Sequence, residues 1–417
     1  NFDVIVVGAG ASGLLAAYAA AESGASVLLI EKNSRAGRKL MITDKGRCHI
    51  TNQAELPDFL KEIHPSGRFL KKAFSQFFSQ NIVSMLQQAG VEVKTERGNR
   101  VFPADDNAGS VVDALVNWNK KLGATLLYDT VVMKILIENN TVTGIRLQKG
   151  STTFNIFGSS VVIATGGKAY PATGSDGDGY RFAREAGHKV ADAVPALVPL
   201  EFQGNAHQML DRLTLKNINA SVWIDGKKHS EAFGEMEFTR HGASGPVILT
   251  LSRDIVTAIN QKQKVKVSID LKPALDNQKL DKRLLRDLNA DGKKNVSNIF
   301  KGWLPSALIP FFTEALHLNP AKEGHQVTAQ ERKEIRKLMK NLTFEVSGYR
   351  PFAEAIITAG GVDTREIKAN TMESKLVKGL YFAGEVINLD ANTGGYNLQI
   401  AWSTGWVAGK NAAKTEK

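Results

Sequence analysis

The sequence predicts an α/β fold in which a β-rich and helical region is inserted between two parts of one sheet-containing domain. Three observations support this prediction. The chain opens on an apolar run, a glycine-rich turn, an alanine-rich helix pattern and a second apolar run. From about residue 194 to 350 the pattern changes to separated β-rich runs followed by helix patterns with breaks, and residues 352–417 return to a buried strand and a final helix. A length of 417 residues allows two or three folding units.

Composition sets the limits on the class of protein. With 43% hydrophobic and 23% charged residues, the chain can bury a normal core, and global disorder is excluded. No apolar run approaches the roughly 20 residues that a membrane span requires. Cys48 is the one cysteine, which excludes an internal disulfide and a Cys-rich metal site, and the eight histidines lack metal-binding spacing. We expect a cytoplasmic protein with no membrane partner and no metal.

The N-terminal segment has the order strand, turn, helix, strand, acid. Phe2–Val7 is an almost continuous apolar run, typical of a strand buried on both faces of a parallel sheet. The helix-forming run Leu14–Ser23 is closed by Gly24, and a second apolar strand, Ser26–Ile30, ends at Glu31. This order predicts a dinucleotide-binding unit.

The turn itself reads GxGxxG, and each of its glycines has a mechanical role. Gly8 makes the tight turn, Gly10 lets the backbone approach a pyrophosphate, and Gly13 lets the helix pack on the strand. The helix N-terminus then offers free N–H groups to phosphates. Glu31 can accept hydrogen bonds from ribose hydroxyls and disfavours a 2′-phosphate, so the expected dinucleotide is FAD or NAD rather than NADP. The alternative is a glycine-rich turn with a structural role only.

Residues 37–52 form a polar, basic stretch directly after the second strand. Arg38, Lys39 and Arg47 could neutralise a pyrophosphate or hold an anionic flavin ring. The alternative is a plain surface connection.

The next segments resemble FAD proteins built like glutathione reductase. Ser160–Ala164 reads as a buried strand that leads into Thr165-Gly166-Gly167, where the backbone of Gly166 would pass close to the dinucleotide. The loop Pro171–Gly179 opens another helix and could present amides to a ligand or serve as a helix entry only. The elements expected before this strand are the helix Ser110–Leu122 and the β-rich runs Thr125–Asn139, Thr141–Gln148 and Thr152–Phe157.

The C-terminal segment distinguishes FAD from NAD. Gly379–Ala383 reads as a buried strand followed by Gly384-Glu385, and Thr393–Gln399 opens a final helix from Ile400 to about Ala413. A second helix N-terminus can stabilise charge on a reduced flavin, and Glu385 can bind the ribityl or phosphate region. An NAD dehydrogenase has no need of such a returning segment. The fold class is therefore α/β, a Rossmann-like FAD-binding domain of the glutathione-reductase type with an inserted β-rich plus helical region.

In the insertion, we expect strands at Thr214–Ile224, Glu235–Thr239 and Lys264–Leu271 and broken helices over Leu280–Lys340. The predicted domains are residues 1–193 and 352–417 for FAD binding, 194–275 with 341–351 for the β-rich part, and 276–340 for the helical part.

The chain is basic, with a formal net charge of +11, and residues 260–300 hold ten Lys or Arg against five Asp. Two interpretations stay open: a solvated Lys-rich face, or a surface for anions or nucleic acid. No nucleic-acid recognition motif accompanies it. The sequence does not predict an oligomeric state.

The whole chain resembles the BaiN-like (YhiN-like) NAD(P)/FAD-dependent oxidoreductases of bacteria, which include aminoacetone oxidases and bile-acid-pathway reductases. The Gly-Arg-Cys and Gly-Gly-Tyr-Asn stretches are the most specific. The matching stretches are Val6–Gly13, Gly37–Asn52, Arg100–Leu115, Ala164–Gly187, Phe238–Ser252, Thr358–Ile367 and Gly379–Gly409.

The resemblance implies which residues line the FAD. The expected set is Gly8, Gly10, Ala11, Ser12, Gly13, Glu31, Lys32, Arg38, Lys39, Gly46, Arg47, Cys48, Val132, Thr165, Gly166, Gly384, Glu385, Gly394, Gly395, Tyr396, Asn397 and Leu398. Two stretches depart from the family pattern. His49 stands where the family usually has Asn. Arg240 stands where the family usually has His, and His241 follows it. The substrates of known relatives should therefore not be carried over.

These features predict an FAD-dependent oxidoreductase that moves a hydride between a small organic substrate and the flavin, with NAD(P)H or oxygen as second partner. No catalytic residue is identified; His49, Arg240, His241 and Tyr396 are the candidates near the ring. Because no second GxGxxG unit exists, NADH or NADPH would dock only transiently. The alternatives are a flavoprotein that binds or modifies RNA through the basic insertion, and a redox-sensing or structural flavoprotein without turnover. Cys48 is either a packing residue beside the flavin or a reactive thiol.

Overall fold

The computed structural model describes residues 1–414, and the chain divides into two compact units. The first unit consists of Asn1–Pro195 and Ala355–Lys417, and the inserted unit is Ala196–Glu354. Each unit has its own cluster of buried apolar side chains. The expected further division of the insertion at residue 276 stays a proposal.

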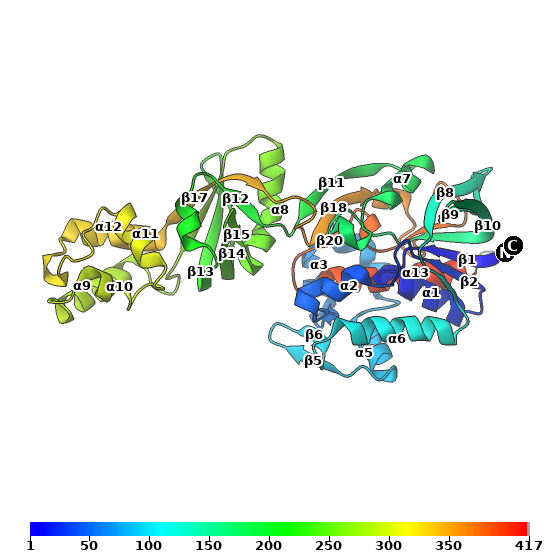
Figure 1. Ribbon diagram of the computed structural model, residues 1–417, viewed down its shortest axis with the longest axis horizontal. Coiled ribbons are helices and arrows are strands. Elements are labelled where there is room, and N and C mark those ends of the chain that lie inside the picture. Colours follow the sequence, from blue (N-terminus) through cyan, green and yellow to red (C-terminus); the bar gives the residue numbers. More distant parts are fainter. Residues whose placement is uncertain (415–417) are drawn as a thin grey trace. The chain divides into compact units, whose positions relative to one another are not determined.

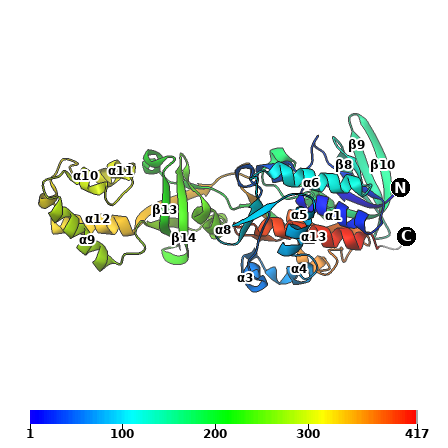
Figure 2. The ribbon, with the colours of Figure 1, turned by 90° about the horizontal axis from the view of Figure 1, so that it is seen from below.

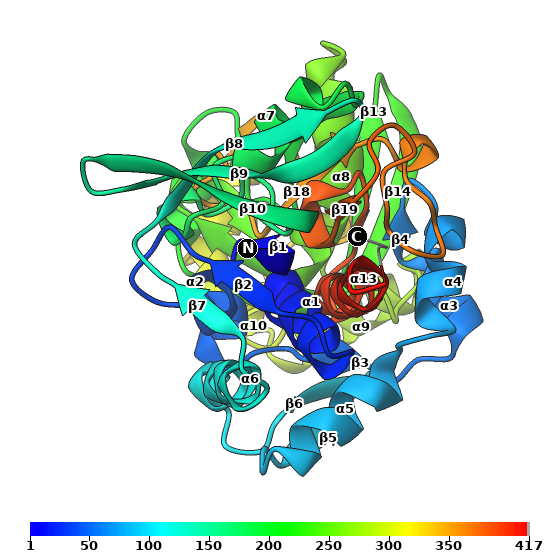
Figure 3. The same cartoon turned by 90° about the vertical axis from the view of Figure 1, so that its right-hand side faces the viewer.

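The first unit is built on a seven-stranded sheet, whose central strands are parallel (Figure 3). The continuous apolar runs of the sequence become strands buried on both faces, as parallel sheets require. The strand order is β7 (Thr125–Leu127), β2 (Val27–Ile30), β1 (Phe2–Val7), β10 (Thr152–Ile163), β9 (Thr141–Lys149) and β8 (Val131–Glu138), with β19 (Leu380–Phe382) also pairing with β10.

Strand β10 differs from the sequence prediction. The runs Thr152–Phe157 and Ser160–Ala164, expected as separate strands, form one continuous element. Its first half pairs antiparallel with β9, while its second half pairs parallel with β1 and β19. The predicted strand Thr125–Asn139 is in turn two strands, because Thr125–Leu127 joins the parallel sheet beside β2. One strand therefore links the parallel sheet to the antiparallel extension.

The helices α1 (Ala11–Glu22) and α13 (Tyr396–Ala412) lie side by side beneath the sheet (Figure 3). They approach closely because glycines of α13 lie on backbone carbonyls of α1: a Cβ on Gly405 would stand 2.2 Å from Ser12 O, and one on Gly409 would stand 2.0 Å from Ala16 O. Residue numbers rise in the same direction along both contacts, so the two helices are parallel and their N-termini point the same way.

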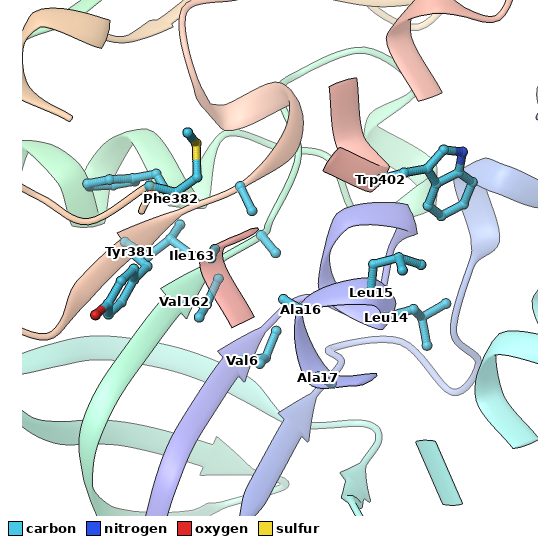
Figure 4. Packing of buried hydrophobic residues seen from close by; sticks show 14 of the residues in the cluster. Val6, Leu14, Leu15, Ala16, Ala17, Val162, Ile163, Tyr381, Phe382 and Trp402 are labelled. Carbon is cyan, nitrogen blue, oxygen red and sulfur yellow. The ribbon is translucent and has the colours of Figure 1, made fainter. Parts of the chain in front are cut away.

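Figure 4 shows how this core packs. Leu14 and Leu15 of α1, Val162 of β10 and Phe382 of β19 are all buried, and Trp402 of α13 is fully enclosed. Its indole N–H donates to Ile50 O at 2.9 Å. The C-terminal helix is therefore anchored both to the first helix and to the segment that follows the second strand.

Further elements of the first unit surround this core. The helices are α2 (Arg38–Ile42), α3 (Leu56–Lys61), α4 (Lys71–Phe74), α5 (Ser79–Gln88), α6 (Ala108–Lys121) and α7 (Asp178–Glu185). The short strands are β3 (Thr51–Asn52), β4 (Ile63–His64), β5 (Val93–Glu96), β6 (Arg100–Pro103), β11 (Val190–Ala196), β18 (Ile357–Val362) and β20 (Asp390–Ala391).

The inserted unit contains a closed β-barrel (Figures 1 and 2). The strands follow one another around it in the order β12 (Leu200–Phe202), β15 (Gly242–Ser244), β14 (Lys227–Thr239), β13 (Thr214–Ile224), β16 (Val265–Asp270) and β17 (Leu342–Tyr349). The inserted unit also contains the helices α8 (Pro246–Asn260), α9 (Asn277–Ala290), α10 (Val296–Phe300), α11 (Leu308–Ala315) and α12 (Ala329–Lys340). Helices α9 and α12 lie together, joined by ion pairs from Arg332 and Arg336 to Asp281.

None of the helices within residues 1–414 has both the length and the apolar character needed to cross a membrane.

Candidate cofactor site

Two glycines of the N-terminal turn are required by the packing of the chain itself. Gly8 has φ +100°, and a Cβ there would stand 2.6 Å from Ala164 O at the end of β10. A Cβ on Gly13 would stand 1.8 Å from Gly8 O, so only glycine lets α1 begin this close to β1. Both roles match those that the spacing predicts.

Gly10 is different, because a Cβ there would meet no atom of the described residues within 4 Å. Its backbone angles, φ −81° and ψ −168°, are open to any residue. Neither conformation nor internal packing calls for glycine at this position. The open space above the N-terminus of α1 is therefore a cradle that a side chain would fill, as a pyrophosphate site requires.

Glu31 stands at the end of β2, 9% exposed, beside this turn. Its Oε2 accepts a hydrogen bond from Ala9 N at 3.0 Å, and its Oε1 accepts from Asn33 N at 2.9 Å and from Asn33 Nδ2 at 2.7 Å. Asn33 was missed by the sequence analysis; it also accepts from Arg38 Nη1 at 2.7 Å. The carboxylate that is expected to bind ribose is thus fixed by the glycine turn and by Asn33.

The Thr165-Gly166 segment follows β10 beside the glycine turn. The Thr165 hydroxyl is buried and has no hydrogen-bond partner in the described part of the chain. Gly166 has φ +74°, a conformation that favours glycine. Lys32, also expected at the site, forms ion pairs with Asp176 at 2.5 Å and Asp178 at 3.2 Å. These two carboxylates tie the loop before α7 to the end of β2.

Lys39 and Glu385 come from opposite ends of the chain and meet in an ion pair of 2.7 Å. Glu385 also accepts a hydrogen bond from Thr358 N at 2.8 Å, and the Thr358 hydroxyl accepts from the amides of Lys168 and Ala169 at 2.8 and 3.0 Å. Thr358 carried no signal in the sequence analysis. This cluster joins four segments at the strand ends of the sheet.

The N-terminus of α13 is shaped by Gly394 and Gly395, with φ of +132° and +89°. Asn52 Nδ2 donates to Gly394 O at 2.9 Å, which ties the turn to β3. Asn397 holds the turn to β20, accepting from Ala391 N at 2.8 Å and donating to Ala391 O at 2.7 Å. Tyr396 packs its ring against Phe59 at 4.7 Å, and burial raises the pKa of its hydroxyl.

His49 lies against this turn. Its imidazole stacks on Phe102 with ring centres 4.5 Å apart, and its Nε2 is buried with no hydrogen-bond partner among the residues that the structure describes. Burial, followed by the nearby Arg100 and Arg47 charges, lowers the pKa of His49 to about 4. The imidazole is therefore neutral at physiological pH.

The side chains of Arg47 and Cys48, which precede His49, contact other residues of the protein. The Arg47 guanidinium binds Glu96 and Asp106 and lies 4.1 Å above the Phe102 ring, and these hydrogen bonds raise its pKa. Its charge is thus already paired with carboxylates. Cys48 is fully buried, and burial raises the pKa of its thiol to about 12. This favours packing over reactivity for Cys48.

The remaining expected residues fall in different places. Gly46 ends a short turn with φ +92°, Val132 is buried on β8, and Gly384 crowds Ser12 of α1, where a Cβ would stand 2.5 Å from the hydroxyl. Arg240 and His241 are exposed between β14 and β15 of the inserted unit. Within residues 1–414, no group of three or more His, Cys, Asp or Glu side chains could hold a metal ion.

Together these residues fit a dinucleotide with two polar ends. The N-termini of α1 and α13 point the same way. At a rise of 1.5 Å per residue, α13 runs about 13 Å from its start at Tyr396 to Gly405, which contacts Ser12 near the start of α1. The first helix offers amides at the open cradle of Gly10, and the second offers amides beside His49. His49 Nε2, beside the second helix start, is a buried polar atom that has no hydrogen-bond partner among the described residues, as a ligand site requires.

Comparisons with known proteins agree with this geometry. The profile of the HI0933-like protein Rossmann domain matches residues 2–411. The 3-dehydro-bile acid delta(4,6)-reductase of Clostridium scindens is 29% identical over 98% of this chain and 98% of its own. The ribosomal RNA dihydrouridine synthase of Escherichia coli is 29% identical over 100% of this chain and 99% of its own.

A solved structure shows the same fold. The 3-ketosteroid delta1-dehydrogenase from Sterolibacterium denitrificans superimposes with a TM-score of 0.51 at 14% identity and covers 100% of both chains. The predicted α/β fold is therefore confirmed. The family profile, the glycine turn and the returning helix together lead to one conclusion: the chain belongs to the HI0933-like family and is an FAD-dependent oxidoreductase.

Proposed function

We propose that the protein reduces a carbon–carbon double bond conjugated to a carbonyl group of a small organic substrate, with NADH or NADPH as electron donor. The observation that carries this is the end-to-end similarity to two relatives whose names describe related chemistry. A delta(4,6)-reductase of a 3-dehydro bile acid and a dihydrouridine synthase both name the saturation of a double bond conjugated to a carbonyl. In the net reaction, the donor gives a hydride to one alkene carbon and the solvent gives a proton to the other.

The residues of this chain would bind and position the reactants. When bound, FAD supplies hydride transfer at its ring system. The amides of α1 beside Gly10 would hold the pyrophosphate, and Glu31 would hold the ribose. Amides at the N-terminus of α13 favour negative charge at the flavin end. Tyr396, at the N-terminus of α13, is the candidate proton donor in the first unit. A tyrosine hydroxyl is protonated at neutral pH, and burial raises the pKa of this one further.

The test is anaerobic reduction of the purified flavoprotein, followed by a panel of acceptors. We expect NADH or NADPH to bleach the visible absorbance of the flavin, and a 3-keto-Δ4,6 steroid or a simpler enone to restore it with the gain of two hydrogen atoms. Molecular oxygen is the comparison acceptor. Bleaching by neither nicotinamide, or reoxidation by oxygen alone, would reject the proposal in favour of an oxidase or a flavoprotein without turnover.

A second candidate substrate is uridine in RNA, which two ribosomal RNA dihydrouridine synthases among the full-length relatives suggest. The inserted unit holds 24 Lys and Arg residues against 18 Asp and Glu residues. On α9, Lys279, Lys282, Arg283 and Arg286 follow the spacing of one helix face. Asp276 and Asp287 neutralise part of this face through ion pairs.

RNA binding is tested by its salt dependence. If RNA is the substrate, the dissociation constant for ribosomal RNA rises steeply with salt, and the K282E/R286E variant weakens binding while FAD affinity stays unchanged. The exposed Lys227→Glu change on the barrel is the matched control. An affinity that does not respond to salt would remove this candidate.

A further inference from the structure

We propose that His49 Nε2 forms a hydrogen bond with the flavin end of bound FAD. This inference deepens the cofactor assignment of the site and does not depend on which substrate the enzyme reduces. His49 stands at a position where the family resemblance expects Asn, so the proposal concerns a feature of this chain.

The position of the imidazole is fixed from two sides. Ile50 N donates to Val101 O at 2.9 Å, which joins the segment to β6, and the imidazole stacks on Phe102 at an angle of 25°. On another side, the turn before α13 comes so close that a Cβ on Gly395 would stand 2.8 Å from His49 Cδ2. Stacking and close packing therefore hold the imidazole at the helix start.

The Nε2 atom of His49 indicates a ligand. Nε2 is buried and has no hydrogen-bond partner within residues 1–414, a costly arrangement for a polar atom. The atom lies beside the N-terminus of α13, the end of the site remote from the pyrophosphate cradle at Gly10. A flavin ring has a hydrogen-bonding edge, and the adenosine end of FAD belongs at Glu31, so the group that reaches His49 is the flavin.

The charges around His49 determine its protonation. Burial is the largest cause of the lowered pKa of His49, about 4. The charges of Arg100 and Arg47 lower the pKa further, and the charge of Glu96 opposes them. A neutral imidazole offers one hydrogen bond without adding a charge beside the reduced ring. FAD binding should therefore show no inflection near the ordinary histidine pKa of about 6.5.

The experiment compares two substitutions of similar size, His49→Gln and His49→Leu. Both lose the aromatic stack on Phe102, but only Gln keeps a polar nitrogen at the distance of Nε2. We expect His49→Leu to raise the dissociation constant for FAD about fivefold, the value of one hydrogen bond, and to shift the visible spectrum of the bound flavin. His49→Gln should stay within about twofold of the unchanged protein.

The control is His229→Gln, an exposed histidine on β14 of the inserted unit, which should leave FAD affinity unchanged. Thermal unfolding of the FAD-free proteins checks that both His49 variants fold. The proposal is overturned if His49→Leu binds FAD with unchanged affinity and spectrum, or if Gln and Leu weaken binding equally. A pH inflection near 6.5 in the FAD affinity would contradict the neutral imidazole. None of these measurements uses an organic substrate, so a failure to reduce enones would reject the proposed function alone.

Discussion

Gly10 is a residue whose missing side chain matters for ligand binding but not for folding. Gly8 and Gly13 are required by contacts inside the protein, whereas the space above Gly10 is open and its backbone angles suit any residue. A methyl group at this position would therefore intrude on whatever occupies the cradle and on nothing else.

We expect Gly10→Ala to weaken FAD binding at least tenfold, equal to about 1.4 kcal/mol, while the free energy of unfolding of the FAD-free protein changes by less than about 1 kcal/mol. The measurements are fluorescence titration with FAD and denaturant unfolding. Gly13→Ala is the matched comparison: its Cβ would overlap Gly8 O, so the FAD-free protein should itself lose about 2–3 kcal/mol. Equal effects of the two substitutions on unfolding would contradict this division of roles.

Cys48 gives a second expectation at this scale. Because the thiol is fully buried and its pKa is raised to about 12, almost no thiolate forms near pH 8, and a thiol reagent should not modify the native protein. One thiol per chain should react after denaturation. Rapid modification of the native protein by dithionitrobenzoate would instead support a reactive cysteine.

Sequence-based prediction succeeded for conformation that depends on neighbours in sequence. The strand, the glycine turn, the helix and the second strand belong to one short segment, and the structure confirms these elements. Contacts such as Lys39 with Glu385, or His49 with Phe102, join distant segments. No local pattern encodes such pairs, since they arise only when separate strands and turns meet in the fold.

At the scale of elements, the pair α1 and α13 sets the geometry of the site. Two glycines of α13 sit on carbonyl groups of α1, so the helix axes come close and the N-termini stay aligned. The distance between the two amide clusters therefore depends on this helix contact.

We expect Gly409→Ala to lower the free energy of unfolding by about 2–3 kcal/mol, because its Cβ would stand 2.0 Å from Ala16 O and the helices must separate. FAD affinity should fall with it, because the start of α13 moves. Thermal unfolding and FAD titration measure both effects. Lys414→Ala, at an exposed position after the same helix, should change stability by no more than about 0.5 kcal/mol. A stable Gly409→Ala protein with full FAD affinity would show that the contact is not limiting.

Element boundaries were the less predictable part of the fold. The apolar run Phe2–Val7 matches β1, whereas β14 begins at Lys227, well before the predicted strand at Glu235. Asp225 and Gly226 both have positive φ, as a two-residue hairpin turn requires, so the signal was present in the sequence. The polar residues after this turn obscured it, since the first part of β14 is largely exposed.

For the whole molecule, the insertion leaves and rejoins the first unit through paired chain segments. Leu200 lies opposite Tyr349 in the barrel, and Arg350 N donates to Pro199 O at 2.9 Å. Arg350 also binds Glu201 at 2.7 Å and Glu354 at 2.6 Å, and these hydrogen bonds raise its pKa. The segments that enter and leave the insertion are thus held side by side.

We expect a short Gly/Ser linker in place of Ala196–Glu354 to leave a folded first unit that still binds FAD, because each unit has its own core and the proposed cofactor residues lie in the first. The dissociation constant should stay within about tenfold of that of the full chain. If Arg240 or His241 acts on the substrate, turnover is lost. A visible spectrum with a bound flavin is the readout, and a colourless or aggregated product would contradict independent folding.

The general architecture was predictable because strand, turn and helix patterns at both ends match one known arrangement. The closed barrel was not, since closure depends on the pairing of β12 with β15 and β17, two long-range contacts of a three-residue strand. Helix α8, which opens at Pro246 between two strands, was likewise absent from the prediction.

The parallel pair of helices has a consequence for biosynthesis. The glycine turn at Gly8 leaves the ribosome well before Gly394 and Gly395 do. A nascent chain can thus form the first strand and its turn while the start of α13 does not yet exist. We therefore expect the coenzyme to be retained only by chains that have been translated past Gly394.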